Sequence, residues 1–305
     1  MRFAAIVILA AAVAGTAAGA STLAPARIAA RIVTGNGPCS ENAGFGALWV
    51  ANAGDSTLAR IDPVTNRVTA KIKVGKGPCG VVSGADAIWV DGYGTNTVER
   101  VDPVQRKVVA SIPIGPSVWD VEFGAGSVWA TSELDGTVSR IDPATNKVVA
   151  TIKAGSGPRQ VRYGAGAIWV GNGVGKNVWR IDPATNRARA VPTGLLGPDS
   201  LAVSDRALWV AANSGSLVLR IDPRTLKIVA RVKVGFHPGN PAFASDGSVF
   251  VPVTGEGTVV RIDPARNLVI ATWNVGSKPF PAAFAFGDVW VPVSGARTVV
   301  RLHVG

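Results

Sequence analysis

The sequence is poor in the residue types that carry most enzyme chemistry. Its 305 residues include two histidines, two cysteines, two tyrosines and one methionine. It contains no Gly-x-Ser-x-Gly segment, no phosphate-binding P-loop and no Cys-x-x-Cys pair. After residue 20, no apolar run is long enough to cross a bilayer. The sequence therefore offers no nucleophile elbow, phosphate loop or dithiol centre, and it predicts no membrane span.

Repetition is the dominant feature of the chain. An Asp-Pro pair returns every forty residues with one insertion, and a buried-type aromatic residue keeps the same spacing. Together these markers define seven repeats, the last of which carries a histidine in place of the aspartate. The aspartates are Asp62, Asp102, Asp142, Asp182, Asp222 and Asp263, and the aromatic residues are Trp49, Trp89, Trp129, Trp169, Trp209, Phe250 and Trp290.

Each repeat reads as four short strands, which we name a to d in chain order. In the second repeat the predicted strands cover residues 79–83, 87–90, 96–102 and 107–112. They are rich in Val, Ile, Thr and Trp and are bounded by Gly and Asp-Pro, and no helical period competes. In the c–d turn, Pro fixes φ, Asp accepts a backbone N–H, and Asn tolerates the left-handed region. The sequence therefore predicts an all-β fold, a seven-bladed β-propeller with four antiparallel strands per blade.

The two ends of the array complement each other. Residues 28–34 resemble strand d of the repeats that follow, whereas the last repeat stops at Gly305 after strand c. Pairing of residues 28–33 with residues 299–304 would complete the last blade and leave no open blade edge. We therefore expect the N-terminal strand to close the last blade, with residues 21–305 forming a single propeller domain.

The first twenty residues differ from the array. Arg2 is followed by an apolar run from Phe3 to about Gly15 and then by Ala18-Gly19-Ala20. A short apolar run before a small-residue cleavage site is typical of a secretory signal peptide. We interpret residues 1–20 as a signal peptide cleaved before Ser21. The protein is then expected to be periplasmic or secreted, in the bacterial cell envelope.

The formal net charge of +11 suggests a polyanionic partner. Most basic residues, however, lie on strand c, in the c–d turn or on strand d, the outer edge of each blade. Positive side chains there discourage edge-to-edge pairing of sheets. We therefore expect a solvated basic rim, no nucleic-acid partner, and strand-c arginines that bind carboxylates or carbonyls of neighbouring blades. These arginines are Arg60, Arg100, Arg140, Arg180, Arg220, Arg261 and Arg301.

The start of strand a is the position that varies most between repeats. Antiparallel strands place the d–a and b–c loops on one face of the ring, so this position lies at the mouth of the central channel. A position with a purely structural role would carry the same residue type in every repeat. Because this position differs in almost every repeat, we interpret the mouth of the channel as a ligand site. The alternative is a channel that is filled only with water. An aromatic face and a planar cation there suit an organic acid or an aromatic group. The candidate binding residues are Glu41, Trp119, Asp120, Arg159, Arg162, Asp199, His237, Asn240 and Phe280.

The two cysteines, Cys39 and Cys79, occupy this same position in consecutive repeats. Equivalent positions of adjacent blades lie closest together near the axis, and an exported chain meets an oxidising compartment. We expect a disulfide. Two free thiols inherited by duplication of one repeat are the main alternative, and a metal site formed with His237 is a third.

The segment VANAGDSTLARIDPVTNRVTAKIKVGKGP, residues 50–78, resembles the YVTN β-propeller repeat. The Ala-Leu-Trp-Val segment at residues 47–50 is similar to streptogramin-lyase-like propellers. The resemblance covers all seven repeats and implies an exported ring, which in many YVTN proteins performs no chemistry. The lyase relatives use a histidine base, an acidic residue and a divalent metal. His303 stands at a turn position, so His237 is the remaining candidate base, and the residues around it match no lyase motif.

Our main hypothesis is a binding or interaction protein with no catalytic residue, metal or cofactor. Its partner would be a small molecule or an envelope protein, and the chain is expected to be a monomer. The alternative is an enzyme of lyase or lactonase type; a lactonase-type metal would take Glu41, Asp199 and Asn240 as oxygen ligands. Polyanion binding is a third hypothesis.

Overall fold

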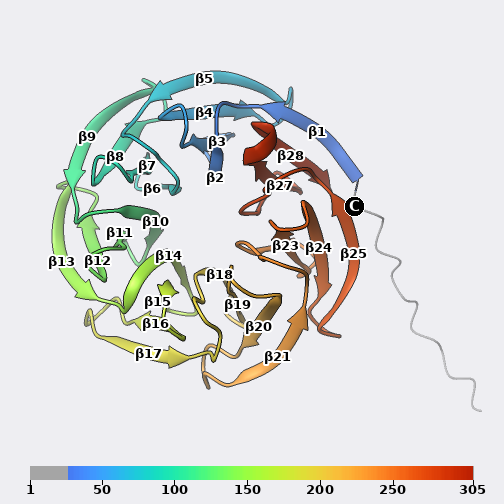
Figure 1. The fold of residues 1–305 in the computed structure, drawn as a ribbon. Helices are drawn as coiled ribbons and strands as arrows, with labels where there is room; N and C mark the ends of the chain where they lie inside the picture. Colours follow the sequence, from blue (N-terminus) through green and yellow to red (C-terminus); the bar gives the residue numbers. More distant parts are fainter. Residues whose placement is uncertain (1–26, 305) are drawn as a thin grey trace, which may run out of the picture.

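The structure is a computed structural model, and it describes residues 27–304. This part of the chain forms seven four-stranded antiparallel sheets, which are arranged as blades around a central axis (Figure 1). The predicted seven-bladed propeller is therefore confirmed. The predicted signal peptide, residues 1–20, lies outside the described residues. Within residues 27–304, no helix is long and apolar enough to span a membrane.

The strands of each blade are given from the axis outward. The first blade contains β2 (Pro38–Gly44), β3 (Ala47–Asn52), β4 (Thr57–Asp62) and β5 (Arg67–Lys73), and the second contains β6 (Val81–Gly84), β7 (Ala87–Gly92), β8 (Thr97–Asp102) and β9 (Lys107–Pro113). The third blade contains β10 (Val118–Gly124), β11 (Ser127–Ser132), β12 (Thr137–Asp142) and β13 (Lys147–Lys153). The fourth contains β14 (Ser156–Gly164), β15 (Ala167–Val174), β16 (Asn177–Ile181) and β17 (Ala188–Pro192). The fifth blade contains β18 (Ser200–Val203), β19 (Leu208–Ala211), β20 (Leu217–Ile221) and β21 (Ile228–Lys233). The sixth contains β22 (Ala242–Phe243), β23 (Val249–Val253), β24 (Thr258–Asp263) and β25 (Leu268–Asn274). The last contains β26 (Ala283–Ala285), β27 (Asp288–Val293), β28 (Thr298–His303) and β1 (Arg27–Val33). A short 3₁₀ helix, η1 (Ser294–Ala296), joins β27 to β28.

The N-terminal strand completes the last blade, as predicted. Strand β1 pairs antiparallel with β28, from Arg27 opposite His303 to Val33 opposite Thr298. Figure 1 shows β1 on the outer edge beside β28. Ile32 of β1 is buried in a cluster that also contains residues of the first blade. The ring is therefore closed both by hydrogen bonds within the last blade and by packing of that blade against the first.

The innermost strand of the second blade is shorter than the sequence predicts. A start at Cys79 was expected, but β6 begins at Val81. The carboxylate of Asp91, a buried residue of β7, accepts hydrogen bonds from the backbone N–H groups of Cys79 and Gly80 at 2.6 and 2.8 Å. These two N–H groups therefore bond to a side chain rather than to the backbone of β7, whereas the backbone N–H of Asp91 still donates to the carbonyl of Gly80 at 3.2 Å.

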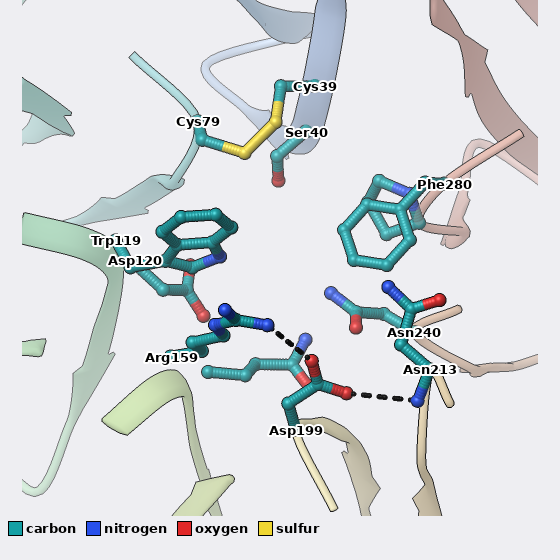
Figure 2. A pocket seen from close by; sticks show the side chains of 12 residues that line it. Cys39, Ser40, Cys79, Trp119, Asp120, Arg159, Asp199, Asn213, Asn240 and Phe280 are labelled. Atoms are coloured by element: carbon teal, nitrogen blue, oxygen red, sulfur yellow. Dashed lines mark hydrogen bonds and ion pairs between the residues drawn. A yellow bond between two sulfur atoms is a disulfide. The ribbon is translucent and has the colours of Figure 1, made fainter. Parts of the chain in front are cut away.

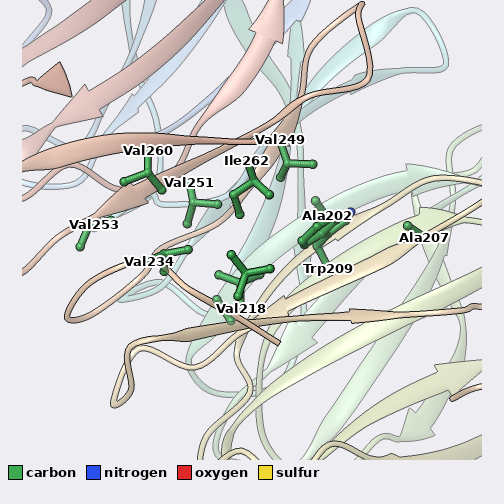
Figure 3. Close-up of a cluster of buried hydrophobic side chains, with 12 residues drawn as sticks. Ala202, Ala207, Trp209, Val218, Val234, Val249, Val251, Val253, Val260 and Ile262 are labelled. Carbon is green, nitrogen blue, oxygen red and sulfur yellow. The ribbon is translucent and has the colours of Figure 1, made fainter. Parts of the chain in front are cut away.

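The hydrophobic core is divided among the interfaces between neighbouring blades. Seven buried clusters are present in residues 27–304, one at each interface. Between the fifth and sixth blades, Trp209 and Val218 pack against Val249 and Val251 (Figure 3). The repeated aromatic residue of strand b is fully buried in every blade. Each blade therefore depends on its two neighbours for burial of its apolar faces.

Four of the seven strand-c arginines join neighbouring blades through backbone carbonyls, as predicted, whereas Arg60 and Arg261 bond within their own blades. The guanidinium of Arg100 lies 5.3 Å from the centre of the Trp89 ring in its own blade. Its Nη1 donates to the carbonyl of Pro143 and to Oδ1 of Asn146, both in the c–d turn of the next blade, at 2.9 and 3.2 Å. The same contacts recur from Arg140, Arg220 and Arg301. These positive charges therefore belong to the scaffold.

Candidate functional site

The variable positions at the starts of the blades meet in a pocket at the mouth of the channel, which we call the axial pocket (Figure 2). Its cavity volume is about 50 Å³. In the first, third and fourth blades these positions begin strand a, and in the others they lie just before it. Six of the predicted site residues line it. The lining consists of Cys39, Ser40, Cys79, Trp119, Asp120, Arg159, Gln160, Asp199, Asn213, Asn240, Phe280 and Pro281.

Two aromatic side chains, Trp119 and Phe280, stand on opposite sides of the axial pocket (Figure 2). The Trp119 ring meets the edge of Tyr93, with 5.4 Å between the ring centres. The guanidinium carbon of Arg159 lies 5.0 Å from the centre of the Trp119 ring, within the range of a cation–π contact. These contacts hold Trp119 in place, so the pocket has a preformed apolar wall.

Arg159 is held by two carboxylates. Its Nε lies 2.8 Å from Oε1 of Glu133, and its Nη1 lies 3.2 Å from Oδ2 of Asp199. Burial opposes the positive charge, but the two acids outweigh it and raise the pKa of Arg159. Burial also raises the pKa of Asp199, although Arg159 counteracts this effect. The charge of Arg159 is thus compensated within the protein, so an anionic ligand would have to compete with both carboxylates.

Two buried amide side chains in the lining of the axial pocket each have an unpaired atom. Oε1 of Gln160 accepts the backbone N–H of Leu201 in the next blade, whereas its Nε2 has no partner among residues 27–304. Oδ1 of Asn240 also has no partner in this part of the chain. The two residues are 3 % and 8 % exposed, respectively. Buried polar atoms without a partner are uncommon in folded proteins because they lose hydration without compensation.

A second charged layer lies further along strand a, away from the mouth. Nη1 of Arg162 lies 2.6 Å from Oδ2 of Asp120 and 3.7 Å from Oε2 of Glu122. Burial raises the pKa of Glu122 to about 8, against the attraction of Arg162. Burial likewise raises the pKa of Glu41 well above its ordinary value, and neither of its carboxyl oxygens has a partner among residues 27–304. Glu41 and Arg162 therefore belong to this layer and do not line the axial pocket.

His237 lines an adjoining groove, which we call the mouth groove. The groove has a volume of about 260 Å³ and shares Arg159, Asp199 and Asn213 with the axial pocket. Nδ1 of His237 contacts the backbone carbonyl of Asn213. A carbonyl can only accept, so Nδ1 is the donor in this contact, and in the neutral tautomer with this proton the lone pair is on Nε2. The complete lining is Arg159, Gly173, Gly197, Asp199, Asn213, Ser214 and His237.

Cys39 and Cys79 form a disulfide in the wall of the axial pocket (Figure 2). Their Cα atoms are 5.0 Å apart, which lies within the range of protein disulfides. Their sulfurs are therefore not thiolate ligands, and the alternative metal site with His237 is wrong. Glu41 lies outside the axial pocket, so the lactonase-like set with Asp199 and Asn240 is not assembled there. Within residues 27–304, no group of three or more His, Cys, Asp or Glu side chains is placed to hold a metal.

Asn213, Glu133 and Gln160 were not among the predicted site residues. The backbone N–H of Asn213 donates to Oδ1 of Asp199 at 3.3 Å. Asn213 belongs to the b–c loop of the fifth blade, whose small polar residues are of the types common in ordinary turns. The same loop position carries Tyr93 in the second blade and Glu133 in the third, and both contact the lining of the axial pocket. Comparison of all seven b–c loops would therefore have identified this position.

No protein-family model and no curated protein matches the chain. Its fold is similar to solved structures at low sequence identity. A catalytically inactive virginiamycin B lyase from Staphylococcus aureus, solved with quinupristin, superposes with a TM-score of 0.80 and 14 % identity over 92 % of this chain and 100 % of that one. A streptogramin B lyase gives a TM-score of 0.79 and 16 % identity over 90 % of this chain and 95 % of the other.

Hydrazine synthase from Kuenenia stuttgartiensis is also similar, with a TM-score of 0.75 and 16 % identity over 88 % of this chain and 96 % of that one. These proteins carry different names for different activities, and at such identities the likeness shows the fold alone. The resemblance to streptogramin-lyase-like propellers is confirmed at this level, and the YVTN-like repeat is consistent with it. The chain is thus a seven-bladed β-propeller of the architecture that these lyases share.

Proposed function

We propose that this protein binds a small molecule whose head enters the axial pocket and whose body lies in the mouth groove. The observation that carries the proposal is the meeting of the variable repeat positions in one pocket. The strand-b aromatic residues and strand-c arginines are nearly invariant across the repeats, as scaffold positions are. Side chains that differ from blade to blade and converge on a cavity are the usual form of a binding site on a rigid ring.

The size and surface of the two cavities indicate the shape of the ligand. The axial pocket admits only a few non-hydrogen atoms, because one water already needs about 10–15 Å³ of such volume. The mouth groove is about five times larger, at 260 against 50 Å³. Exposed apolar side chains surround this face in the loops of consecutive blades. They are Leu134, Val174, Leu196 and Phe236. A ligand with a small polar head and a partly apolar body fits this arrangement.

The experiment is a thermal-shift screen of a small-molecule library, followed by calorimetry on variants. Hits should lose at least about tenfold in affinity with Trp119→Ala and with Arg159→Ala, because each change removes part of the preformed wall. Arg187→Ala is the matched control, since Arg187 is an exposed arginine of the same blade in the c–d turn of the opposite face. Hits whose affinity is the same in all three variants would contradict the proposal.

A second candidate function is favoured by His237. Its Nε2 lone pair makes it a possible general base beside Arg159 and Asp199 in the mouth groove, a set of groups that suits proton abstraction. Incubation with quinupristin, followed by mass spectrometry, tests lyase-type cleavage. Product formation that disappears in His237→Ala would support an enzyme; intact quinupristin in the presence of added divalent metal would count against a lyase of this specificity.

We also propose that the protein acts in an oxidising compartment of the cell envelope, as a monomer. The signal-peptide-like residues 1–20 and the disulfide between Cys39 and Cys79 support this location. Cell fractionation with N-terminal sequencing is the test. A protein that begins at Ser21 in the periplasm or the medium is expected, whereas an uncleaved cytoplasmic protein would contradict it.

A further inference from the structure

Gln160 lines the axial pocket and carries a buried hydrogen-bond donor without a partner among residues 27–304. Its amide could in principle point either way, but the backbone N–H of Leu201 needs an acceptor, and Oε1 of Gln160 provides it. The orientation of the amide is therefore set by the neighbouring blade, and Nε2 is directed away from Leu201. Gln160 lines the axial pocket, is 3 % exposed, and its Nε2 has no partner among residues 27–304. A ligand acceptor that reaches this nitrogen would supply the hydrogen bond that it lacks.

The other side of the pocket presents acceptors. Asn240 is 8 % exposed, and its Oδ1 has no partner in the described part of the chain. Figure 2 shows Asn240 reaching toward the centre of the pocket, with Asp199 nearby. The Asp199 carboxylate accepts from Arg159 and from the backbone N–H of Asn213, and its four lone-pair sites leave capacity for a further donor. The ligand must therefore also bring N–H or O–H donors.

The charge of the lining argues against an anionic head. Asp120 and Asp199 line the pocket and Glu133 pairs with its arginine, so three carboxylates are present. Two guanidinium groups, those of Arg159 and Arg162, oppose them. Arg162 belongs to the layer beyond the pocket, where Glu122 adds a further acid beside it, so the carboxyl groups outnumber the guanidinium groups. A carboxylate ligand would add repulsion, and an ammonium ligand would leave Nε2 of Gln160 without an acceptor.

We infer that the axial pocket selects a neutral planar head group that carries both an acceptor and N–H donors, such as a primary carboxamide or a urea. Its oxygen would accept from Gln160, its N–H groups would donate to Asn240 and Asp199, and its plane would lie between Trp119 and Phe280. A carboxamide has three non-hydrogen atoms, which suits a cavity of about 50 Å³. This inference rests on the proposed small-molecule function and names the chemistry of its head group.

The test compares three probes that share one phenyl ring and differ in the head group: phenylacetamide, phenylacetate and phenethylamine. Dissociation constants are measured by NMR titration of the disulfide-bonded chain that begins at Ser21. Phenylacetamide is expected to bind at least about tenfold more tightly than either charged probe, because only the amide satisfies donor and acceptor together. Equal or tighter binding of phenylacetate would overturn the inference, and so would the absence of phenylacetamide binding up to its solubility limit.

Two variants connect the preference to named atoms. Gln160→Glu keeps an acceptor for Leu201 but replaces the donor by a carboxylate oxygen, so phenylacetamide should lose at least about tenfold in affinity while phenethylamine gains. Asn240→Leu removes the acceptor at similar volume and should weaken phenylacetamide by about tenfold. Gln105→Glu, in a c–d turn on the opposite face, is the control.

The outcomes separate this inference from the function on which it rests. If library ligands bind in a manner that depends on Trp119 and Arg159, yet the two pocket variants leave phenylacetamide affinity unchanged, the head-group inference is wrong and the binding function stands. If no ligand depends on Trp119 or Arg159, the binding function itself fails. Unfolding midpoints of the variants show whether a loss of affinity reflects a loss of fold.

Discussion

Arg301 in the last blade donates a hydrogen bond to the backbone carbonyl of Pro63 in the first, with 2.6 Å between Nη1 and O. The same nitrogen lies 2.9 Å from Oδ1 of Asn66. This is the contact that Arg100 makes to the third blade and Arg140 makes to the fourth. The junction between the two ends of the chain therefore uses the same link as three of the internal junctions, in addition to the β1–β28 pairing.

The junction between the first and second blades lacks this link, and the reason is visible in the turn. The second blade carries Arg106, at a left-handed φ of 56°, where four other turns carry Asn and the fifth-blade turn carries Leu226. Arg60, which would reach this turn, instead donates to Oγ1 of Thr69 in its own blade at 2.7 Å. Arg106→Asn should stabilise the fold by about 1 kcal/mol, because Asn tolerates the left-handed region and offers Arg60 an acceptor.

Urea unfolding of wild type and Arg106→Asn measures this difference in free energy. Asn146→Arg, which makes the reverse change in the third blade, is the control and should destabilise by a similar amount. An unchanged or lower midpoint for Arg106→Asn would show that the repeated asparagine does not contribute in the way described.

Closure of the last blade by β1 can be tested at two adjacent residues. Ile32 is 5 % exposed within the cluster between the last and first blades, whereas Val33 is 70 % exposed. Ile32→Asp should cost about 3 kcal/mol or more, because it buries an unpaired charge at an interface. Val33→Asp should change stability by less than about 0.5 kcal/mol.

A chain beginning at residue 35 should expose the edge of β28 and aggregate. A soluble truncated chain of wild-type stability would refute the closure.

Stability should fall as pH rises through the neutral range. Burial raises the pKa of Glu122 from 4.5 to about 8, so between these values the folded state holds a proton that the unfolded state has released. This contribution is complete below about pH 4.5 and is lost as pH approaches 8. Glu41 acts in the same direction. The exposed turn aspartates, such as Asp142, have lowered pKa values and act in a separate, acidic window.

Glu122→Gln should reduce this pH dependence and raise stability at alkaline pH relative to wild type. The difference should reach a few kcal/mol at most, since each unit of pKa shift corresponds to about 1.4 kcal/mol. Unfolding midpoints at pH 5, 7 and 9 of both proteins provide the measurement. Parallel pH profiles for the two proteins would show that Glu122 is already ionised in the folded state at neutral pH.

The disulfide between Cys39 and Cys79 should be quantitative in protein isolated from an oxidising compartment. Digestion without reductant, followed by mass spectrometry, should yield the linked peptides. The bridge closes a loop of forty residues, so Cys39→Ser with Cys79→Ser should cost about 3–4 kcal/mol in the chain-entropy model. Two alkylatable thiols in the native protein would contradict this prediction.

Most of the fold could be predicted because each structural position occurs seven times. The spacing of the Asp-Pro turns and of Trp49 and its equivalents predicted the blade number, and the likeness of residues 28–34 to strand d predicted the pairing of β1 with β28. The start of β6 was mispredicted because the N–H groups of Cys79 and Gly80 bond to the buried Asp91 side chain, and strand a also begins late in the fifth, sixth and seventh blades. A repeat pattern predicts the features that the blades share, and it does not predict where a strand of an individual blade begins.

The candidate site was predictable in position but not in detail. Variation between repeats identified Trp119, Arg159 and Asp199, and the structure places all three in the axial pocket. It places Glu41 in the layer beyond the pocket, because a shift of two residues along strand a moves a side chain away from the mouth. The unpaired Nε2 of Gln160 could not be predicted either, since it follows from the hydrogen bond that Oε1 makes to another blade.

The most direct test of the account is a crystal structure of the protein with a ligand from the screen. The account predicts electron density for the head of the ligand in the axial pocket, between Trp119 and Phe280, with the body continuing along the mouth groove toward His237. Density for the ligand on the c–d turn face, or anywhere that leaves Trp119 and Arg159 uncontacted, would contradict it.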